Sequence, residues 1–422
     1  MKIFIINDIN DIFKKKITHF SLDKGLYLGY GLSENNCSVY FLTTGESKIF
    51  NNINFINLAE ANLFFLRTMD LIIIVRESLI TNLFDNYEDI KNYILDKSKT
   101  TKIMVKSDSI QWILDKNFRK YISENFNIKP HTKHIVKWVC NYFDYICVQT
   151  KEFVNDAVNN NIPINKIIQL NMAVPNIPVI ISDLQNPYDI NHNYCVNLSS
   201  QLASNKALMP LYYIKNAHEI KNFNIIKNII VYTGRIKTDS GKIFYFMREL
   251  MAKLGDNFEL HIFPGSFIIP DICNGTNMAC SALNAHHLNL LRETIFSDSK
   301  NIIIHYPYEH KDMFTYLHFA YCGIDFSDIR PNNAICKAGH AKILEYCLVG
   351  LPIVCEDNIN NLFLIKNGKN GIILPYLSST DDYASAIKKI GSMQINREYC
   401  RKITFENENC IKRAHELLQL LK

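Results

Sequence analysis

The most constraining feature of the sequence is an alternation of short apolar runs with helical segments, which appears once in each half of the chain. Runs of Ile, Val and Leu predict strands in the first half at Lys2–Ile6, Cys37–Thr43, Asp70–Val75, Thr101–Val105 and Tyr145–Val148. The second half restarts the pattern with a strand and then a tight turn in Asn228–Arg235, and a strand and then a turn in Phe258–Gly265. Further strands are predicted at Asn301–His305, Cys322–Phe326 and Gly371–Leu374. Such runs are typical of parallel strands that are buried on both faces. We therefore predict an α/β protein with two doubly wound parallel sheets.

The length of the chain also predicts more than one domain. A chain of 422 residues is too long for a single hydrophobic core. The stretch from Pro175 to about Asn193 is rich in Pro, Asn and Asp, which is typical of a linker. We predict a first domain at 1–178, an irregular crossing at 179–225, a second domain at 226–400 and a terminal helix at 401–422 that packs back on the first domain.

Composition excludes several classes of protein. A hydrophobic content of 48% with 21% charged residues is that of a folded globular chain. The net charge of +5 is too small to indicate nucleic-acid binding, although it suits an anionic substrate or membrane face. Twelve cysteines without a C-x-x-C pair are interpreted as reduced core residues. With no signal peptide and no apolar run long enough to span a bilayer, we expect a cytoplasmic protein or one at the cytoplasmic membrane face.

The segment Cys336–Val354 predicts a loop, a helix and a buried strand. Gly339 permits a tight turn or a positive φ in the backbone before the helix, and Gly350 stands where the helix should end. Lys342 and Glu345 fall about one helical turn apart, so both side chains should lie on one face. By itself the pattern fits any βα unit.

The letters of this segment add a resemblance. Here they are K-I-L-E-Y-C-L-V-G-L-P-I-V, which is similar to the "K-L-x-E-Y-x-x-x-G-x-P-V-V" segment at the nucleotide-sugar site of GT-B-fold glycosyltransferases in the large retaining, family 4-like group. The resemblance implies two Rossmann-like domains facing a cleft. It implies a nucleoside-diphosphate sugar as donor in the second domain, an acceptor in the first, no cofactor and no metal.

The resemblance assigns the donor to residues around this helix. Glu345 would accept hydrogen bonds from the ribose hydroxyls, since a carboxylate offers two acceptor oxygens to a cis-diol. Gly339, His340 and Lys342 would lie beside the phosphates at the helix N-terminus. The alternative for Glu345 is a surface acid that pairs with Lys342. Lys337 stands where many members carry a glutamate that contacts the sugar, which leaves open whether transfer is altered or abolished.

A second resemblance follows the first strand of the second half. The run G-R-I-K-T-D-S-G-K resembles "G-R-hydrophobic-x-x-x-K-G", whose Arg and Lys hold the donor diphosphate. Gly234 and Arg235 match it, and the lysine is either Lys237 or Lys242. A fixed guanidinium stabilises the charge that develops on a leaving diphosphate, so we predict a catalytic role for Arg235. The alternative is a solvated loop arginine.

Three weaker matches complete the predicted donor site. Gly265 resembles a turn glycine near the sugar, and Tyr306 and Tyr308 lie in a Y-P-Y-E-H run that is similar to a loop contacting the nucleobase. Ordinary turns would explain all three equally. Asp325 and Asp328 have the residue types of metal ligands, but in a GT-B pattern we expect no metal there.

The first half should supply the acceptor site. The family commonly carries a histidine after its middle strand, and the stretch Ile103–Ser109 has none. Asp108 is the predicted replacement, to orient the acceptor hydroxyl or accept its proton; the alternative is a helix N-cap. The basic runs Lys14–Lys16 and His131–Trp138 could contact a lipid-linked acceptor or a membrane, although such runs are more often solvated helix faces.

The predicted function is transfer of a sugar from a nucleoside-diphosphate sugar to a glycan, lipid-linked or other hydroxyl acceptor, with retention and without metal. A sugar-nucleotide epimerase shares the expected fold but lacks the K-x-x-E-Y form. The alternative from another class is a non-catalytic GT-B protein that binds a sugar nucleotide or a protein partner.

Overall fold

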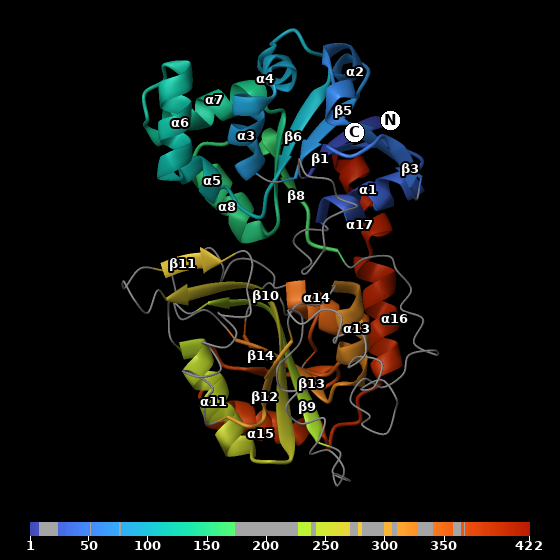
Figure 1. Cartoon of the computed structure of the whole chain (residues 1–422), viewed down its shortest axis with the longest axis vertical. Coiled ribbons are helices and arrows are strands. Elements are labelled where there is room, and N and C mark those ends of the chain that lie inside the picture. The colour runs from blue at the N-terminus through green and yellow to red at the C-terminus, as the bar shows by residue number, and fades with distance from the viewer. Residues whose placement is uncertain are drawn as a thin grey trace, which may run out of the picture.

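The computed structural model divides the chain into two halves, each built on one mostly parallel sheet (Figure 1). The part of the chain that the structure describes comprises residues 1–7, 24–50, 52–75, 77–173, 227–237, 242–270, 277–280, 299–305, 310–326, 341–357, 364–366 and 368–422. The predicted boundaries at 178 and 226 lie outside these residues, and the predicted start of the terminal segment at 401 falls inside a helix that begins at Arg397. The α/β fold class is confirmed.

The first half contains an eight-stranded sheet in the order β3-β4-β2-β1-β5-β6-β7-β8. Its strands are β1 (Lys2–Ile6), β2 (Ser38–Thr43), β3 (Lys48–Phe50), β4 (Ile53–Asn57), β5 (Leu71–Ile74), β6 (Lys102–Lys106), β7 (Tyr145–Val148) and β8 (Ile167–Gln169). Its helices are α1 (Lys24–Glu34), α2 (Leu63–Arg67), α3 (Ser78–Asn86), α4 (Glu88–Leu95), α5 (Gln111–Leu114), α6 (Lys116–Phe126), α7 (Thr132–Tyr142) and α8 (Lys151–Asn159), with short 3₁₀ turns at Leu58–Glu60 and Ile164–Lys166. All neighbouring strands in this sheet are parallel except the β3–β4 pair.

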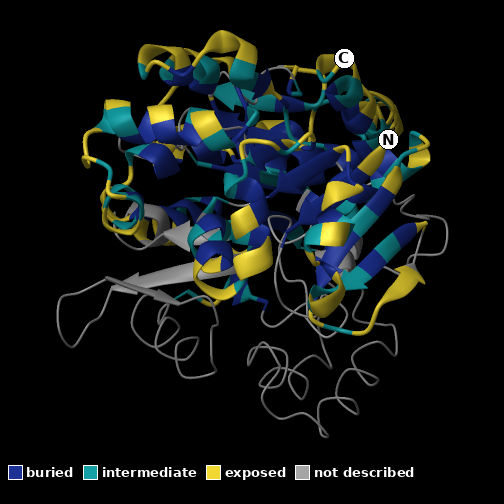
Figure 2. Cartoon of the chain, turned by 90° about the horizontal axis from the view of Figure 1, so that it is seen from above, coloured by how far each residue is buried: buried dark blue, intermediate teal, exposed yellow. Residues whose placement is uncertain are grey.

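Both faces of the first sheet are buried, as the apolar runs predict. Along β1, Phe4 and Ile6 pack under the helices α2 to α8, while Ile3 and Ile5 pack against α1 and the C-terminal helix α17 (Cys410–Leu420). Figure 2 shows the central strands in the colour of buried residues. A strand that is apolar on every residue therefore fits this sheet, because successive side chains point to opposite and equally dry faces.

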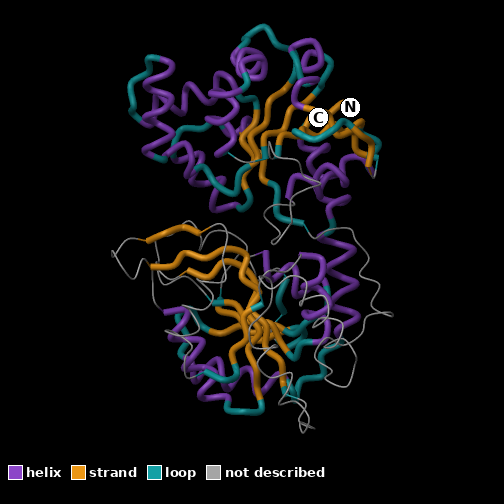
Figure 3. The backbone as a smooth tube through the Cα atoms, in the orientation of Figure 1, coloured by secondary structure: helices purple, strands orange, loops and turns teal. Residues whose placement is uncertain are grey.

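The second half contains a seven-stranded sheet in the order β11-β10-β9-β13-β14-β15, with β12 paired to β10 (Figure 3). Its strands are β9 (Asn228–Lys237), β10 (Phe258–Pro270), β11 (Asn277–Cys280), β12 (Ile302–Ile304), β13 (Cys322–Asp325), β14 (Ile353–Glu356) and β15 (Gly371–Leu374). The helices are α11 (Lys242–Leu254), α13 (His310–Phe319), α14 (Ala341–Leu348), α15 (Thr380–Ile390) and α16 (Arg397–Glu408). Helices α11 and α15 cover one face, and α13 and α14 cover the other.

Two predicted strands end later than expected. The sequence placed tight turns at Gly234–Arg235 and at Pro264–Gly265, but β9 continues to Lys237 and β10 to Pro270. The two strands stay paired beyond a register shift that lies between Pro264 and Phe267. A local irregularity accommodates a proline and glycines inside a strand without ending it. Gly265 is therefore a residue within β10, and its assignment to a turn is wrong.

The last two helices cross from the second half to the first. Helix α16 packs on α14, and α17 packs on α1, so closely that a Cβ atom at Gly31 would lie 2.2 Å from the carbonyl oxygen of Cys410. Asn409 separates the two helices and caps both of them. Its amide donates to the carbonyl of Phe405 at 2.7 Å, and its Oδ1 accepts from the backbone N–H of Lys412 at 2.8 Å. One residue thus ends α16 and begins α17.

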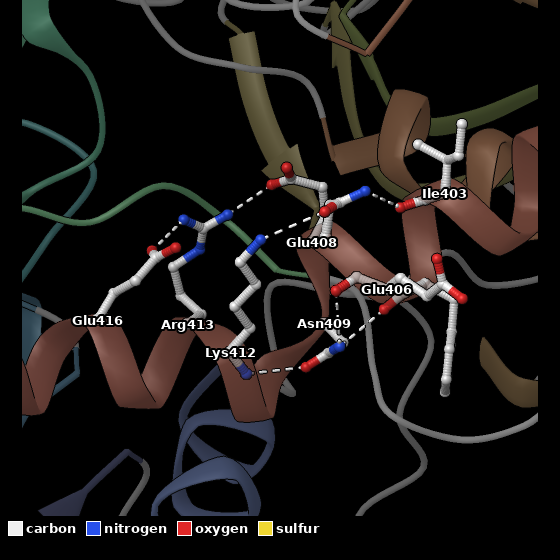
Figure 4. Close-up of polar contacts among 9 residues, drawn as sticks. Ile403, Glu406, Glu408, Asn409, Lys412, Arg413 and Glu416 are labelled. Atoms are coloured by element: carbon white, nitrogen blue, oxygen red, sulfur yellow. Dashed lines mark hydrogen bonds and ion pairs between the residues drawn. The ribbon is translucent and has the colours of Figure 1, made fainter.

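A buried arginine bridges this junction (Figure 4). Arg413 on α17 forms ion pairs with Glu408, the last residue of α16, and with Glu416, one turn further along α17. Burial of the guanidinium is tolerated because both carboxylates accept its hydrogen bonds. The bend between the two helices is therefore held by side chains on both sides of it.

The halves present matching ends of their sheets to each other. In Figure 1 the chain leaves the carboxyl end of β8 in the direction of the second half, and β10 runs toward the first half. Since the strands within each sheet are mostly parallel, the carboxyl ends of both sheets lie toward the junction of the halves. Among the described residues, no helix is long and apolar enough to cross a membrane.

Candidate functional site

The order of the strands singles out one place in the second sheet. From β9 the chain moves outward to β10 and β12, and it then returns to place β13 on the other side of β9. Connections that leave two adjacent strands in opposite directions create a crevice at their carboxyl ends, where open α/β sheets bind ligands. Thr233 and Gly234 of β9 and Asp325 of β13 lie at this edge.

Helix α14 lies against the same edge, where the sequence predicted it. It runs from Ala341 to Leu348, and its end is marked by Gly350, whose φ of +67° suits a residue without a side chain. The backbone N–H of Leu351 donates to the carbonyl of Tyr346 at 2.9 Å, which closes the last turn. The predicted order of helix and strand and the predicted helix end are both confirmed, while the predicted loop lies outside the described residues.

Glu345 is a buried polar residue of this helix. Only 6% of it is exposed, and its Oε2 accepts a hydrogen bond from Thr233 Oγ1 at 3.0 Å. The neighbouring Tyr346 hydroxyl accepts from the backbone N–H of Thr233 at 2.9 Å. The alternative of a surface acid that pairs with Lys342 is wrong, because Glu345 is turned into the protein, against the end of β9.

Lys342 points to the same edge but has different partners. Its Nζ lies 3.0 Å from Asp325 Oδ1 and 4.0 Å from the centre of the Tyr232 ring. Burial alone would lower the pKa of this ammonium, but the opposite charge of Asp325 and the nearby Tyr232 outweigh it and raise the pKa above its usual value. The charged form of the lysine is therefore favoured, and its partner is a carboxylate that is 3% exposed.

Gly234 lies directly above the lysine stem. Its φ of +100° is strained for any residue with a side chain, and a Cβ there would lie 3.4 Å from Lys342 Cε. The glycine thus turns the backbone of β9 over the buried ion pair. Arg235 follows it within β9, and its side chain lies outside the part of the chain that the structure describes.

The remaining predicted donor residues are placed only in part. Lys242 is the first residue of α11, and Gly265 lies within β10. The other predicted residues lie outside the described part of the chain, namely Tyr306, Tyr308, Gly339 and His340, together with Lys337 and Asp328. The structure therefore brings together Gly234, Lys342 and Glu345.

In the first half, Asp108 follows β6 at the carboxyl edge, as predicted. Its side chain is exposed, and its carbonyl oxygen accepts from the backbone N–H of Gln149 at 3.2 Å. Helix α5 begins after Ile110, and it is the hydroxyl of Ser109 that accepts from the backbone N–H of Gln111. The cap-like hydrogen bond before α5 thus comes from Ser109.

Sequence reasoning missed the partners of the two α14 residues. Thr233 binds Glu345, while Asp325 and Tyr232 surround Lys342. Two signals pointed to them, since Thr233 is polar at the end of an apolar run and Asp325 ends the next central strand. Among the described residues, no group of three His, Cys, Asp or Glu side chains is placed to hold a metal ion.

Comparison with known proteins places this architecture among solved structures. No protein-family profile and no curated protein sequence matches the chain. The structure is similar to HepE of Anabaena in complex with UDP-glucose, with 10% identity and a TM-score of 0.57 over 100% of this chain and 99% of that one. Sucrose-phosphate synthase of Thermosynechococcus elongatus and a glycosyltransferase of Rickettsia africae each give 13% identity and a TM-score of 0.55 over 100% of this chain and 98% of theirs. These likenesses show that the chain has the GT-B fold.

Proposed function

We propose that this protein is a glycosyltransferase that moves a sugar from a nucleoside-diphosphate sugar to a hydroxyl acceptor. The observation that carries the proposal is Glu345. A carboxylate is buried at the carboxyl edge between β9 and β13, and it is held by the Thr233 hydroxyl in a fold where ligands bind at that edge. The fold it shares with HepE, a structure in complex with UDP-glucose, supports the same donor class.

The donor would lie above the ends of β9 and β13. Glu345 would accept hydrogen bonds from the ribose diol, because a carboxylate offers two acceptor oxygens. Gly234 would let the diphosphate approach the backbone, and Arg235 with Lys237 or Lys242 would supply cations to the leaving group. We propose that transfer occurs with retention and without a metal or another cofactor.

A donor screen tests the site directly. Nucleoside-diphosphate sugars that bind only the native protein should raise its melting temperature. In Glu345→Ala the affinity for the best donor should fall by about 1.5–3 kcal/mol, since a charged hydrogen-bond partner is lost. Glu124→Ala, at an exposed acid on α6, is the matched control and should bind as the wild type does. Unchanged donor affinity in Glu345→Ala would rule out the ribose role.

A transfer assay separates the enzyme from a non-catalytic GT-B protein. With a donor in hand, release of the nucleoside diphosphate in the presence of candidate acceptors measures turnover. Arg235→Ala should lower turnover more than it lowers affinity for the free nucleoside, because its cation acts on the diphosphate. A wild-type protein that binds the donor but neither transfers nor hydrolyses it would establish the binding protein instead.

The acceptor is proposed to be a glycan or a lipid-linked hydroxyl compound, handled in the cytoplasm. Lys129, Lys133 and Lys137 are exposed around α7, and, after burial, Lys133 is the cation that most lowers the pKa of His134. Trp138 is buried, so any membrane contact would be electrostatic and would not insert this ring. Co-sedimentation with anionic but not neutral vesicles, lost in Lys133→Glu with Lys137→Glu, would support peripheral binding.

A further inference from the structure

The first sheet has its own point where the connections reverse. From β1 the chain moves to β2 and β4 on one side, and it then returns to β5 on the other side of β1. The loop after β5 therefore lies beside the crevice that such a reversal creates. Glu77 belongs to this loop and stands immediately before the first residue of α3. In the GT-B arrangement described above, this edge lies toward the second half.

Glu77 is held by a buried serine from the neighbouring strand. Ser107 follows β6, its Oγ donates to Glu77 Oε2 at 2.9 Å, and only 8% of the serine is exposed. The backbone N–H of Ser107 in turn donates to the carbonyl of Cys147 at 3.0 Å, so the serine is anchored to the sheet. The hydroxyl fixes one carboxylate oxygen, while Glu77 as a whole remains half-buried.

Asp108, the other carboxylate at this edge, lies further from the crevice than Glu77 does. It follows β6, which is one strand further from the reversal, since β6 pairs with β5 and β5 pairs with β1. Adjacent strands lie roughly 4.8 Å apart, so the two loops are neighbours but not equivalent. Glu77 is the residue whose carboxylate is clamped by a buried hydroxyl next to the reversal, whereas the Asp108 side chain is exposed.

We propose that Glu77 is the acceptor-binding carboxylate of the first half and that Ser107 is its positioning residue. This inference rests on the proposed function and names a residue that the sequence motifs do not mark. Glu77 accepts a hydrogen bond from a neutral acceptor hydroxyl and orients its oxygen toward the donor. Ser107 acts only through Glu77, because its hydroxyl fixes the rotamer of that side chain. A single carboxylate can accept hydrogen bonds from neutral hydroxyl groups. The proposed class of acceptor is therefore a neutral polyol, such as a sugar ring.

Four variants test the assignment in the full-length protein. Glu77→Gln keeps the shape of the side chain but weakens its acceptor strength, and it should lower transfer about 100-fold. Ser107→Ala should lower transfer about 10-fold, and Ser107→Thr, which keeps a hydroxyl, should restore most of it. In the Glu77→Gln background, Ser107→Ala should have no further effect. Donor affinity, and hydrolysis of the donor by water, should change little in all four.

The controls separate a positioning role from a structural one. Asp85→Asn is the matched control, since this exposed carboxylate at the other end of α3 accepts a hydrogen bond from Tyr121 Oη, and it should transfer at close to the wild-type rate. The inference is overturned if Glu77→Gln transfers normally, or if Ser107→Ala costs as much in the Glu77→Gln background as in the wild type. A loss confined to Asp108→Asn would give the role to Asp108. If the wild type itself binds no nucleotide sugar, the proposed function fails first and this inference falls with it.

Discussion

The buried ion pair under Gly234 gives the sharpest test of how this half of the protein is held together. Lys342→Met replaces the ammonium by an apolar group of similar length and leaves Asp325 charged, 3% exposed and without its cation. Removing one member of a buried pair typically costs about 3–5 kcal/mol, because the remaining charge is uncompensated. The contact with the Tyr232 ring is lost as well. We therefore expect a loss of at least about 3 kcal/mol in the stability of the second half.

The assay must report on that half alone. Both tryptophans, Trp112 and Trp138, belong to the first half, so their fluorescence during urea unfolding serves as an internal control. Hydrogen exchange of peptides that cover β9 and β13 gives the opening free energy where the pair lies. Lys102→Met is the matched variant, since Lys102 pairs with Asp144 at 3.3 Å with side chains 56% and 28% exposed. An exposed pair of this kind should contribute no more than about 1 kcal/mol.

Two results would refute the reasoning. One is a Lys342→Met variant whose exchange in β9 matches that of Lys102→Met. The other is a lack of coupling in the double variant Lys342→Met with Asp325→Leu. Because an apolar replacement of both partners removes the stranded charge, the double variant should be more stable than Lys342→Met by roughly 1–4 kcal/mol.

Three further outcomes follow from contacts in the second half. Gly323→Ala should destabilise it by about 1–3 kcal/mol in hydrogen exchange, since a Cβ would lie 2.6 Å from the Tyr346 ring. Tyr346→Phe should cost about 1–3 kcal/mol in the same measurement, because a buried backbone N–H loses its acceptor. Burial lowers the pKa of both His261 and His305, which share a hydrogen bond of 2.7 Å. The unfolded chain therefore binds more protons below about pH 6.5, so stability should fall on acidification, and His305→Phe should flatten that fall in urea titrations followed by circular dichroism.

Much of the fold could be predicted because both sheets are buried on both faces. Continuous apolar runs such as Asp70–Val75 identify such strands, because both faces of the sheet are buried and every side chain of the strand can be apolar. The ends of β9 and β10 could not be predicted in the same way. Gly234 and Pro264 are typical of turns, but here they lie within paired strands that tolerate an irregularity. Local sequence cannot distinguish these cases, because the pairing partner decides.

The site could be predicted where it is local in sequence. Lys342 and Glu345 lie three residues apart on one helix, so their spacing places them on one face. The sequence marks Thr233 and Asp325 only as polar residues at strand ends. Which helix residue each one contacts could not be predicted, since they come from different strands, more than 100 and about 17 residues away in the chain. The spacing left open a pair between Lys342 and Glu345 as the alternative, and the structure instead gives each residue its own buried partner.

Because Lys342 is paired with Asp325 and Glu345 with Thr233, the cation that a bound diphosphate needs must come from another residue. Asp325 already pairs with Lys342, so this ammonium is not left over to pair with a phosphate. A nucleoside diphosphate above Gly234 would therefore need a different cation to face its negative charge. Arg235 is the next residue of β9, and a guanidinium there would bind phosphate oxygens in pairs. In the proposed donor site the ribose and the diphosphate would depend on different residues, so loss of Glu345 should weaken binding of nucleoside and nucleoside diphosphate alike, whereas loss of Arg235 should weaken binding of the diphosphate only.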